Sequence, residues 1–374
     1  MRRIWDVPLS HRLVVGALVI MVGPFSSRFD TYLAASREQR TTDAPLLQVD
    51  PSWPKPLPHN WTLGPVSGIS ADSRDHIWII HRVKQAPGIP APDVIEFDQE
   101  GNIVQTWTPG TGTGYTWMEQ VHGITVDSGD HVWISGNGTT DAHILEFDRA
   151  GKFLMQIGHA GKNGGSNDTA NLGRATQVRL DAERNEIYIS DGERNQNHRV
   201  IVFDATSGAY KRHWGAYGEK PDDSAVTARF DPAGPPPRQF SGAVHCVRVA
   251  RDGLVYVCDR GNDRFQIFRK DGTFVKEFFL VKDTKGQGSV WDIDYSPDQK
   301  FMYVADGTNQ HVWILLRETL EVLGSIGERG TNPGQFATGV HDLAVDSKGN
   351  LYTGEAETGG RVQKFTFKGV SATK

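Results

Sequence analysis

Cysteine is scarce in this chain of 374 residues, which contains only two. Two cysteines exclude a disulfide-rich scaffold and any zinc finger built from cysteine alone. Basic charge is not in excess either: 40 Lys and Arg stand against 45 Asp and Glu, so the footprint of a nucleic-acid-binding protein is missing. After residue 45 no apolar run reaches the roughly 20 residues of a membrane-spanning helix. We therefore expect no nucleic-acid partner, and membrane contact only through an amino-terminal anchor.

Glycine and proline, by contrast, are abundant, with 41 and 19 residues, and aromatic residues make up 10% of the chain. The aromatic residues supply enough core material to exclude a disordered protein. The glycines and prolines follow no fixed period, which excludes collagen and is typical of short strands joined by turns. Composition therefore favours an all-β protein, either as several domains or as one large unit.

A repeat of four strands recurs six times and predicts the architecture. The copies of its first strand are VSGISAD (66–72), VHGITVD (121–127), TQVRLDA (176–182), VHCVRVA (244–250), VWDIDYS (290–296) and VHDLAVD (340–346). Six units of this kind predict a six-bladed β-propeller over residues 46–367, and the repeat resembles that of NHL-repeat propellers. The sixth copy lacks a fourth strand, so we expect a strand within 46–63 to close the ring. Residues 368–374 are then a tail.

The amino terminus has the pattern of an export signal. Arg2, Arg3 and Arg12 flank an apolar run over 13–23, and basic residues followed by about 7–15 apolar ones are typical of a secretory signal peptide. We assign 1–35 to a signal peptide and 36–45 to a polar tether, so the protein is expected to be periplasmic or secreted. The alternative is a membrane anchor formed by 13–23.

Cys246 and Cys258 straddle the turn around Asp252 and Gly253 and can face each other across a hairpin. In an oxidising compartment they could form a disulfide, and the alternative is two free thiols.

Three histidines occupy one position of the repeat. His122, His245 and His341 each follow the Val that opens a first strand, in the second, fourth and sixth copies. The first strand of a propeller blade is innermost, and alternate blades of six are about 120° apart, so the three imidazoles should converge near the axis. Such a tripod with an open fourth position is typical of a catalytic zinc site. The alternative is a hydrogen-bonded structural histidine copied between blades.

Two arginines are placed beside this site by the repeat. Arg82 ends the second strand of the first copy, and Arg260 follows the second strand of the fourth. Guanidinium groups bind carboxylates bidentately, so we expect a substrate with a carboxylate; salt bridges at the blade edges are the alternative. Turn positions nearby that we interpret as structural are Asp191, Asp259 and Asp306.

Across residues 64–367 the repeat resembles the peptidyl-α-hydroxyglycine α-amidating lyase family. The segments that carry the resemblance are GPVSGISADSRDHIWIIHR, VHGITVD, RVIVFDATSGAYKRHWG, VHCVRVA, CDRGNDRFQIF and VHDLAVDSKGNLYTGEAETGGRVQKF. The resemblance implies a zinc ion on the three histidines and functional roles for Arg82 and Arg260. It also implies a structural calcium held by the Asp342 side chain and the carbonyls of Val66 and Ile124, oxygen ligands that suit this ion.

One departure concerns the catalytic base. The family has a Tyr after the Asp-Gly of the third unit, where this chain has Glu193. A carboxylate, with an ordinary pKa near 4.3 against about 10 for Tyr, is a far weaker base. Tyr115 and Tyr217, on loops, are candidate substitutes. The disulfide pattern of the family is also missing, and Gly339 stands where a Met is usual.

Three functions are compatible with these features. The first is an exported zinc-dependent lyase that cleaves the C–N bond of an α-hydroxyglycine-like substrate, a small molecule or peptide, to an amide and glyoxylate, with Arg82, Arg260 and Glu193 as catalytic residues. The second is a non-catalytic extracytoplasmic propeller that binds a ligand. The third is a metal-dependent hydrolase such as a lactonase, because fold alone does not determine chemistry. No feature of the sequence indicates an oligomeric state.

Overall fold

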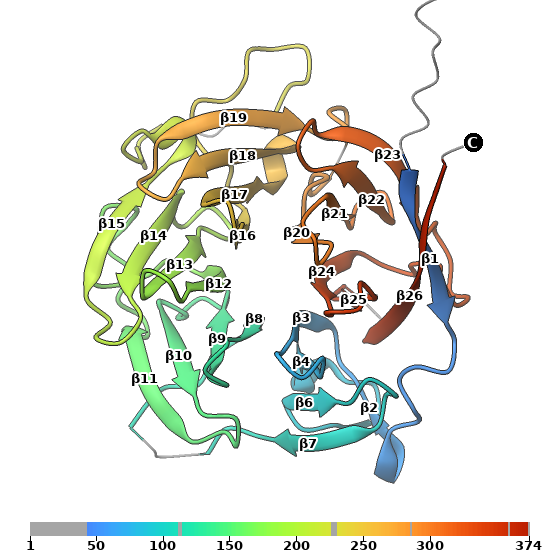
Figure 1. The fold of residues 1–374 in the computed structure, drawn as a ribbon. Helices are drawn as coiled ribbons and strands as arrows, with labels where there is room; N and C mark the ends of the chain where they lie inside the picture. The colour runs from blue at the N-terminus through green and yellow to red at the C-terminus, as the bar shows by residue number, and fades with distance from the viewer. Residues whose placement is uncertain (1–42, 111–113, 226–229, 285, 358–359, 373–374) are drawn as a thin grey trace, which may run out of the picture. The chain divides into compact units, whose positions relative to one another are not determined.

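The computed structural model describes residues 43–110, 114–225, 230–284, 286–357 and 360–372. In these residues six sheets of four strands surround a central axis, which confirms the all-β, six-bladed β-propeller (Figure 1). This part of the chain contains no α-helix, only 3₁₀ turns at Pro58–Asn60, Val83–Gln85, Ala216–Gly218 and Arg260–Asn262. None of its helices is long and apolar enough to cross a membrane. The expected signal peptide or anchor, 1–35, lies outside the described residues.

The strands of each blade are antiparallel and follow one another from the axis outward in the first five sheets. The first sheet contains β3 (Val66–Ala71), β4 (Ile77–His81), β6 (Val94–Phe97) and β7 (Ile103–Trp107). The second contains β8 (Val121–Val126), β9 (Val132–Gly136), β10 (His143–Phe147) and β11 (Phe153–Gly158). The third contains β12 (Ala175–Asp181), β13 (Glu186–Asp191), β14 (Arg199–Asp204) and β15 (Tyr210–Trp214). The fourth contains β16 (Val244–Val249), β17 (Leu254–Asp259), β18 (Arg264–Arg269) and β19 (Phe274–Phe279). The fifth contains β20 (Asp292–Tyr295), β21 (Phe301–Asp306), β22 (His311–Leu316) and β23 (Glu321–Ile326).

The sixth sheet combines both ends of the described chain. Its strands, from the axis outward, are β24 (Val340–Val345), β25 (Leu351–Glu355), β26 (Arg361–Ala372) and β1 (Asp43–Asp50). β1 and β26 are antiparallel, with Asp43 opposite Ala372 and Asp50 opposite Lys364. The outer strand therefore starts inside the segment expected as a tether, and β26 continues through most of the expected tail. Polarity did not reveal these residues as strands, because an outermost strand such as β1 buries few of its residues, Pro45 alone in this case.

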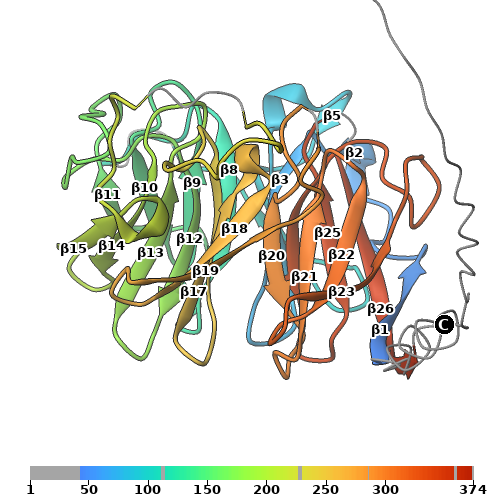
Figure 2. The ribbon, with the colours of Figure 1, turned by 90° about the horizontal axis from the view of Figure 1, so that it is seen from above.

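A short parallel pair, β2 (Trp61–Thr62) and β5 (Ile89–Pro90), lies outside the six blades. Figure 2 shows the ring edge-on, with this pair at one of its faces.

The core consists of apolar layers between neighbouring blades. In one of them Trp78 and Ile80 of β4 pack with Val121 of β8 and Ile134 of β9. The aspartate that ends a first strand anchors the tryptophan of the second strand: the Trp78 indole N–H donates to Asp72 over 3.1 Å. The following blade repeats this contact with its own Asp–Trp pair. Blade-to-blade packing of this kind surrounds the axis with rigid inner strands.

Buried ion pairs fix the turns after the second strands. Arg199 Nε donates to Asp191 over 2.8 Å, and Arg264 Nε donates to Asp259 over 2.7 Å, with all four side chains inaccessible to solvent. The corresponding carboxylate of the fifth blade, Asp306, accepts from an indole N–H. These contacts support the structural interpretation of the three aspartates.

Cys246 and Cys258 lie directly opposite each other on β16 and β17, with their Cα atoms 4.8 Å apart. They form a disulfide, so of the two alternatives left open by the sequence the structure shows the paired one.

Candidate metal centre

The three histidines converge at one end of the channel. His122, His245 and His341 are the second residues of the inner strands β8, β16 and β24. The centroids of their rings are 4.7–4.9 Å apart, and one nitrogen of each lies within 4.8 Å of the others. We call this end of the channel the histidine mouth. Three equivalent repeat positions on alternate blades thus form the tripod that the sequence predicts.

Hydrogen bonds to neighbouring blades orient two of these rings. His122 Nδ1 donates to the carbonyl of Thr176 over 3.0 Å, and His245 Nδ1 donates to the carbonyl of Trp291 over 2.5 Å. A ring that donates through Nδ1 keeps the lone pair of Nε2 free, which is the tautomer of a metal ligand. The Nε2 of His245 is buried and has no hydrogen-bond partner.

Burial keeps all three imidazoles neutral. It holds the pKa of His122, His245 and His341 well below the ordinary 6.5, and the nearby guanidinium group of Arg260 lowers each pKa further. A contact with the backbone of Ser67 raises the pKa of His341, but this offsets only part of the effect of burial. Neutral imidazole is the form that binds a metal.

This donor set fits zinc. Three neutral imidazoles, with the buried Nε2 of His245 and Nδ1 of His341 left without a partner, match a site with three protein ligands and an open fourth position. The sulfur of Cys246 is in the disulfide. Two other groups in the described chain bring His and carboxylates together, Asp72–His76–Glu96 and Asp127–His131–Glu146. They are less suitable, because in each an indole N–H already occupies the aspartate.

A cavity of about 350 Å³ opens beside the histidines. Its walls come from the turns of several blades, and the polar side chains among them include Arg82, His122, Asn137, Glu193, Arg194, Arg260, Gln287, His341 and Glu357. The cavity therefore brings together all three predicted catalytic residues, two of the histidines and a third arginine.

Arg260 is the most constrained of these arginines. Its side chain is 9% exposed, its Nη2 donates to Glu193 Oε1 over 2.9 Å, and its guanidinium group lies 4.5 Å from the centre of the Trp291 ring. Its Nε and the second oxygen of Glu193 are both buried without a partner. A ligand can therefore still accept a hydrogen bond from Nε of Arg260 and donate one to this oxygen of Glu193.

Arg82 lies across the cavity in a crowded cationic setting. Burial lowers its pKa, and the positive charges of Arg194 and Arg260 lower it further while Glu357 and Glu193 raise it. With its carboxamide oxygen turned toward the arginines, Gln120 accepts from Arg194 over 3.1 Å and from Arg82 over 3.3 Å. Three guanidinium groups with one carboxylate in direct contact form a pocket that favours an anion.

The chain is similar in sequence to several known proteins. A family model described as "Lactonase, 7-bladed beta-propeller" matches residues 214–320. The human NHL repeat-containing protein 3 is 28% identical over 87% of this chain and 85% of its own length. The peptidyl-alpha-hydroxyglycine alpha-amidating lyase 1 of Drosophila melanogaster is 24% identical over 86% of this chain and 60% of its own. The chain is therefore similar to an NHL repeat-containing protein and to an amidating lyase.

Other proteins to which the chain is similar are larger. The peptidyl-glycine alpha-amidating monooxygenase B of Xenopus laevis is 25% identical over 86% of the chain, which spans 35% of that protein. Among solved structures, virginiamycin B lyase from Staphylococcus aureus aligns over 87% of this chain and 89% of its own, with a TM-score of 0.47 and 12% identity.

Trp291 and Arg194 line the cavity beside the histidines, and the sequence did not predict a functional role for either of them. Trp291 occupies the aligned histidine position of the fifth blade but packs under Arg260 and against two of the histidine rings. A Cβ at Gly307 would come within 2.7 Å of its indole, and one at Gly339 within 3.3 Å. The tryptophan fills this space, which explains why glycine stands at 339.

Neither candidate tyrosine lines the cavity. Tyr115 stacks on Phe153, and its hydroxyl donates to the carbonyl of Gly110. Tyr217 donates through its hydroxyl to Glu277 over 3.0 Å. Among the sequence-predicted bases, the histidine mouth therefore holds Glu193 alone. Gly242, in the loop between β15 and β16, also lines the cavity.

Of the predicted calcium ligands, Asp342 directly follows His341 on β24. Asp342 accepts from the backbone N–H of Ile69 over 3.1 Å and, through its other oxygen, from Gln177 over 2.9 Å. The guanidinium group of Arg248 is 3.7 Å away. As arranged, this carboxyl faces N–H donors and a cation, a setting that does not suit calcium, so the ligand set of Val66, Ile124 and Asp342 stays a prediction from the resemblance.

Proposed function

We propose that this propeller is an exported zinc-dependent lyase that cleaves the C–N bond of an α-hydroxyglycine-like substrate, releasing an amide and glyoxylate. The observation that carries the proposal is the shared mouth: a tripod of neutral imidazoles opens beside a cavity lined by Arg82 and Arg260. When bound, zinc would supply Lewis-acid polarisation of a substrate oxygen.

Recognition of the substrate carboxylate is assigned to the arginines. Arg82 has a buried Nε without a partner, and so has Arg260. A carboxylate placed between them would satisfy these donors, and its charge would relieve the mutual repulsion of the guanidinium groups. A cation–π contact with the face of the Trp291 ring holds the guanidinium group of Arg260 in place. The amide side of the substrate then points toward the open end of the cavity.

Proton transfer is assigned to Glu193. Its free oxygen takes the proton of the α-hydroxyl as the C–N bond breaks, the carbonyl of glyoxylate forms, and the bonding electrons leave with nitrogen. The same carboxyl then returns the proton to nitrogen, which completes the amide. The ion pair with Arg260 orients the carboxylate of Glu193, whose second oxygen is buried without a partner.

Export is the second part of the proposal. The disulfide between Cys246 and Cys258 supports an oxidising compartment, because such bonds are rare in proteins of the reducing cytosol. The basic and apolar pattern around 13–23 supports a signal peptide, with a membrane anchor as the alternative.

The experiment measures bound zinc and glyoxylate release from a peptidyl-α-hydroxyglycine. The wild type should bind one zinc ion and release glyoxylate, and His245→Ala should lose both. Glu193→Gln should keep the metal and lose roughly 10²–10⁴-fold in kcat, the usual contribution of a general base. The control is Glu183→Gln, since Glu183 has an exposed carboxylate, 85% accessible. Equal rates for Glu193→Gln and the wild type would show that Glu193 does not transfer the proton.

A non-catalytic ligand-binding propeller is favoured by one observation: Arg260 already has a carboxylate partner in Glu193. A protein of this kind would bind stoichiometric zinc and carboxylate ligands and release no glyoxylate. A hydrolase would instead open lactones, and assay of a simple lactone in parallel distinguishes the third function. Absence of zinc from the purified protein would refute the metal centre itself.

A further inference from the structure

A second cavity lies on the axis, at the end of the channel opposite the histidines. It has a volume of about 340 Å³, and all six inner strands contribute to its wall. Arg248 lies three positions after His245 on β16, and Thr125 lies three positions after His122 on β8. At about 3.3 Å per strand residue, the two cavities are separated by roughly 10 Å of channel. We call this end the far mouth.

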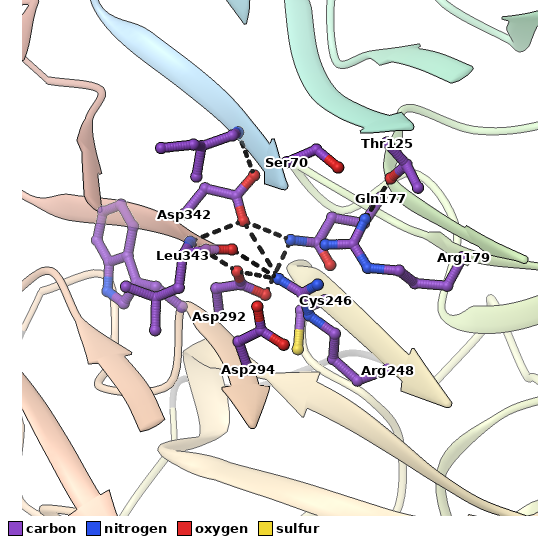
Figure 3. Close-up of polar contacts among 12 residues, drawn as sticks. Ser70, Thr125, Gln177, Arg179, Cys246, Arg248, Asp292, Asp294, Asp342 and Leu343 are labelled. Carbon is purple, nitrogen blue, oxygen red and sulfur yellow. Dashed lines mark hydrogen bonds and ion pairs between the residues drawn. The ribbon is translucent and has the colours of Figure 1, made fainter. Parts of the chain in front are cut away.

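Two arginines reach into the far mouth, and they differ in their partners (Figure 3). Arg248 Nη2 donates to Asp292 over 2.6 Å and to the carbonyl of Leu343 over 3.0 Å. Arg179 Nη1 donates to the hydroxyl of Thr125 and to the carbonyl of Val178. In the described chain no carboxylate lies within 4 Å of Arg179, so this guanidinium group has no counter-ion in contact.

Several donors in this cavity are unused. The Nε atoms of Arg179 and Arg248 are buried without a hydrogen-bond partner, and the Arg248 side chain is 10% exposed. Ser70 Oγ accepts from the backbone N–H of Val126 over 3.0 Å, which leaves its O–H free to donate. Buried guanidinium N–H groups without partners cost free energy, and an anion that accepts from them removes that cost.

The carboxyl groups around the two arginines are mostly engaged. Asp292 is paired with Arg248, and Asp342 accepts from Gln177 and from Leu343. Asp294, which lines the cavity, accepts the backbone N–H of Val345 over 2.9 Å, and burial raises its pKa. Burial and the neighbouring Arg248 lower the pKa of Arg179, and the carboxyl groups of Asp292, Asp342 and Asp294, none of them in contact with it, raise that pKa only in part.

We propose that the far mouth binds the carboxylate group of a small molecule between the guanidinium groups of Arg179 and Arg248. One guanidinium group without a counter-ion matches a singly charged anion better than a doubly charged phosphate. The hydroxyl of Ser70 offers a further donor to the same group. This site is independent of the histidine mouth and of the reaction proposed there.

The test measures acetate binding by ligand-observed NMR on metal-free protein carrying Arg82→Gln, so that the arginines of the histidine mouth contribute little. Saturable binding is expected, with phosphate weaker at equal ionic strength. Arg179→Gln in the same background should weaken acetate at least tenfold. Arg251→Gln, which removes an exposed arginine outside the cavity, should leave it unchanged.

A second variant keeps the proposal falsifiable if Arg179→Gln does not fold. Ser128 lines the cavity at its exposed rim, so Ser128→Asp should weaken acetate severalfold by repulsion while Ser128→Asn does not. No saturable binding in the Arg82→Gln background would overturn the proposal. Unchanged affinity in folded Arg179→Gln, or in Ser128→Asp, would overturn it equally.

Discussion

Removing His245 should abolish the stabilisation of this protein by zinc. A protein site with four ligands binds zinc with about 10–16 kcal/mol, so one ligand contributes about 3 kcal/mol and its loss weakens binding about 10²-fold. His245 suits this test because its Nε2 is buried and has no hydrogen-bond partner in the protein, so this nitrogen is free to bind a metal. The variant is His245→Ala.

The expected shift in Tm follows from the number of residues in the propeller. Zinc at 100 times its Kd stabilises the folded state by about 2.7 kcal/mol. The roughly 330 residues from Asp43 to Ala372 have an unfolding entropy of about 0.7 kcal/mol per kelvin, so Tm rises by about 4 °C. A 100-fold weaker site at the same zinc concentration gains about 0.4 kcal/mol, which moves Tm by less than 1 °C.

Thermal unfolding of chelator-treated protein, with and without added zinc, measures this difference. The control is His159→Ala, which removes an exposed histidine whose ring hydrogen-bonds to Asn171, and it should keep the full shift. A shift of 4 °C that survives in His245→Ala would show that zinc binds elsewhere. The absence of any shift in the wild type would refute the metal centre.

Three further predictions concern stability. Burial raises the pKa of Asp263 from 3.8 to about 7, so its carboxyl costs stability as pH rises above 3.8; Asp263→Asn should stabilise by about 1–3 kcal/mol at pH 8 and not at pH 3.5, measured by urea unfolding. Arg199→Met should cost about 3–5 kcal/mol in the same assay, because Asp191 is left buried and unpaired. Replacing Cys246 and Cys258 together by Ala should cost about 3 kcal/mol for a closed loop of 12 residues, and a reducing agent should then have no further effect.

The propeller and the histidine tripod were predictable because both follow from the repeat. Equivalent positions of equivalent strands point the same way, so His122, His245 and His341 had to meet near the axis once six blades closed a ring. The two arginines were predictable for a related reason, since each comes directly after a second strand and therefore lies at the mouth.

The neighbours of the tripod could not be predicted in this way, since they come from turns that differ between blades. Glu193 contacts Arg260 across 67 residues of sequence. Arg194 reaches the cavity through a turn in which it and Asn195 have positive φ angles of 54° and 58°, a conformation uncommon for residues other than glycine. Turn geometry of this kind depends on local packing, and the repeat pattern does not encode it.

The pairing of β1 with β26 has a consequence for how the protein is made. Asp43 and Ala372 are partners in one sheet, so the ring is complete only after almost the whole chain has left the ribosome. Contacts of such sequence separation form slowly, because the entropy of closing a large loop opposes them. A chain whose first and last strands pair finishes folding late, so it stays open for longer after its synthesis.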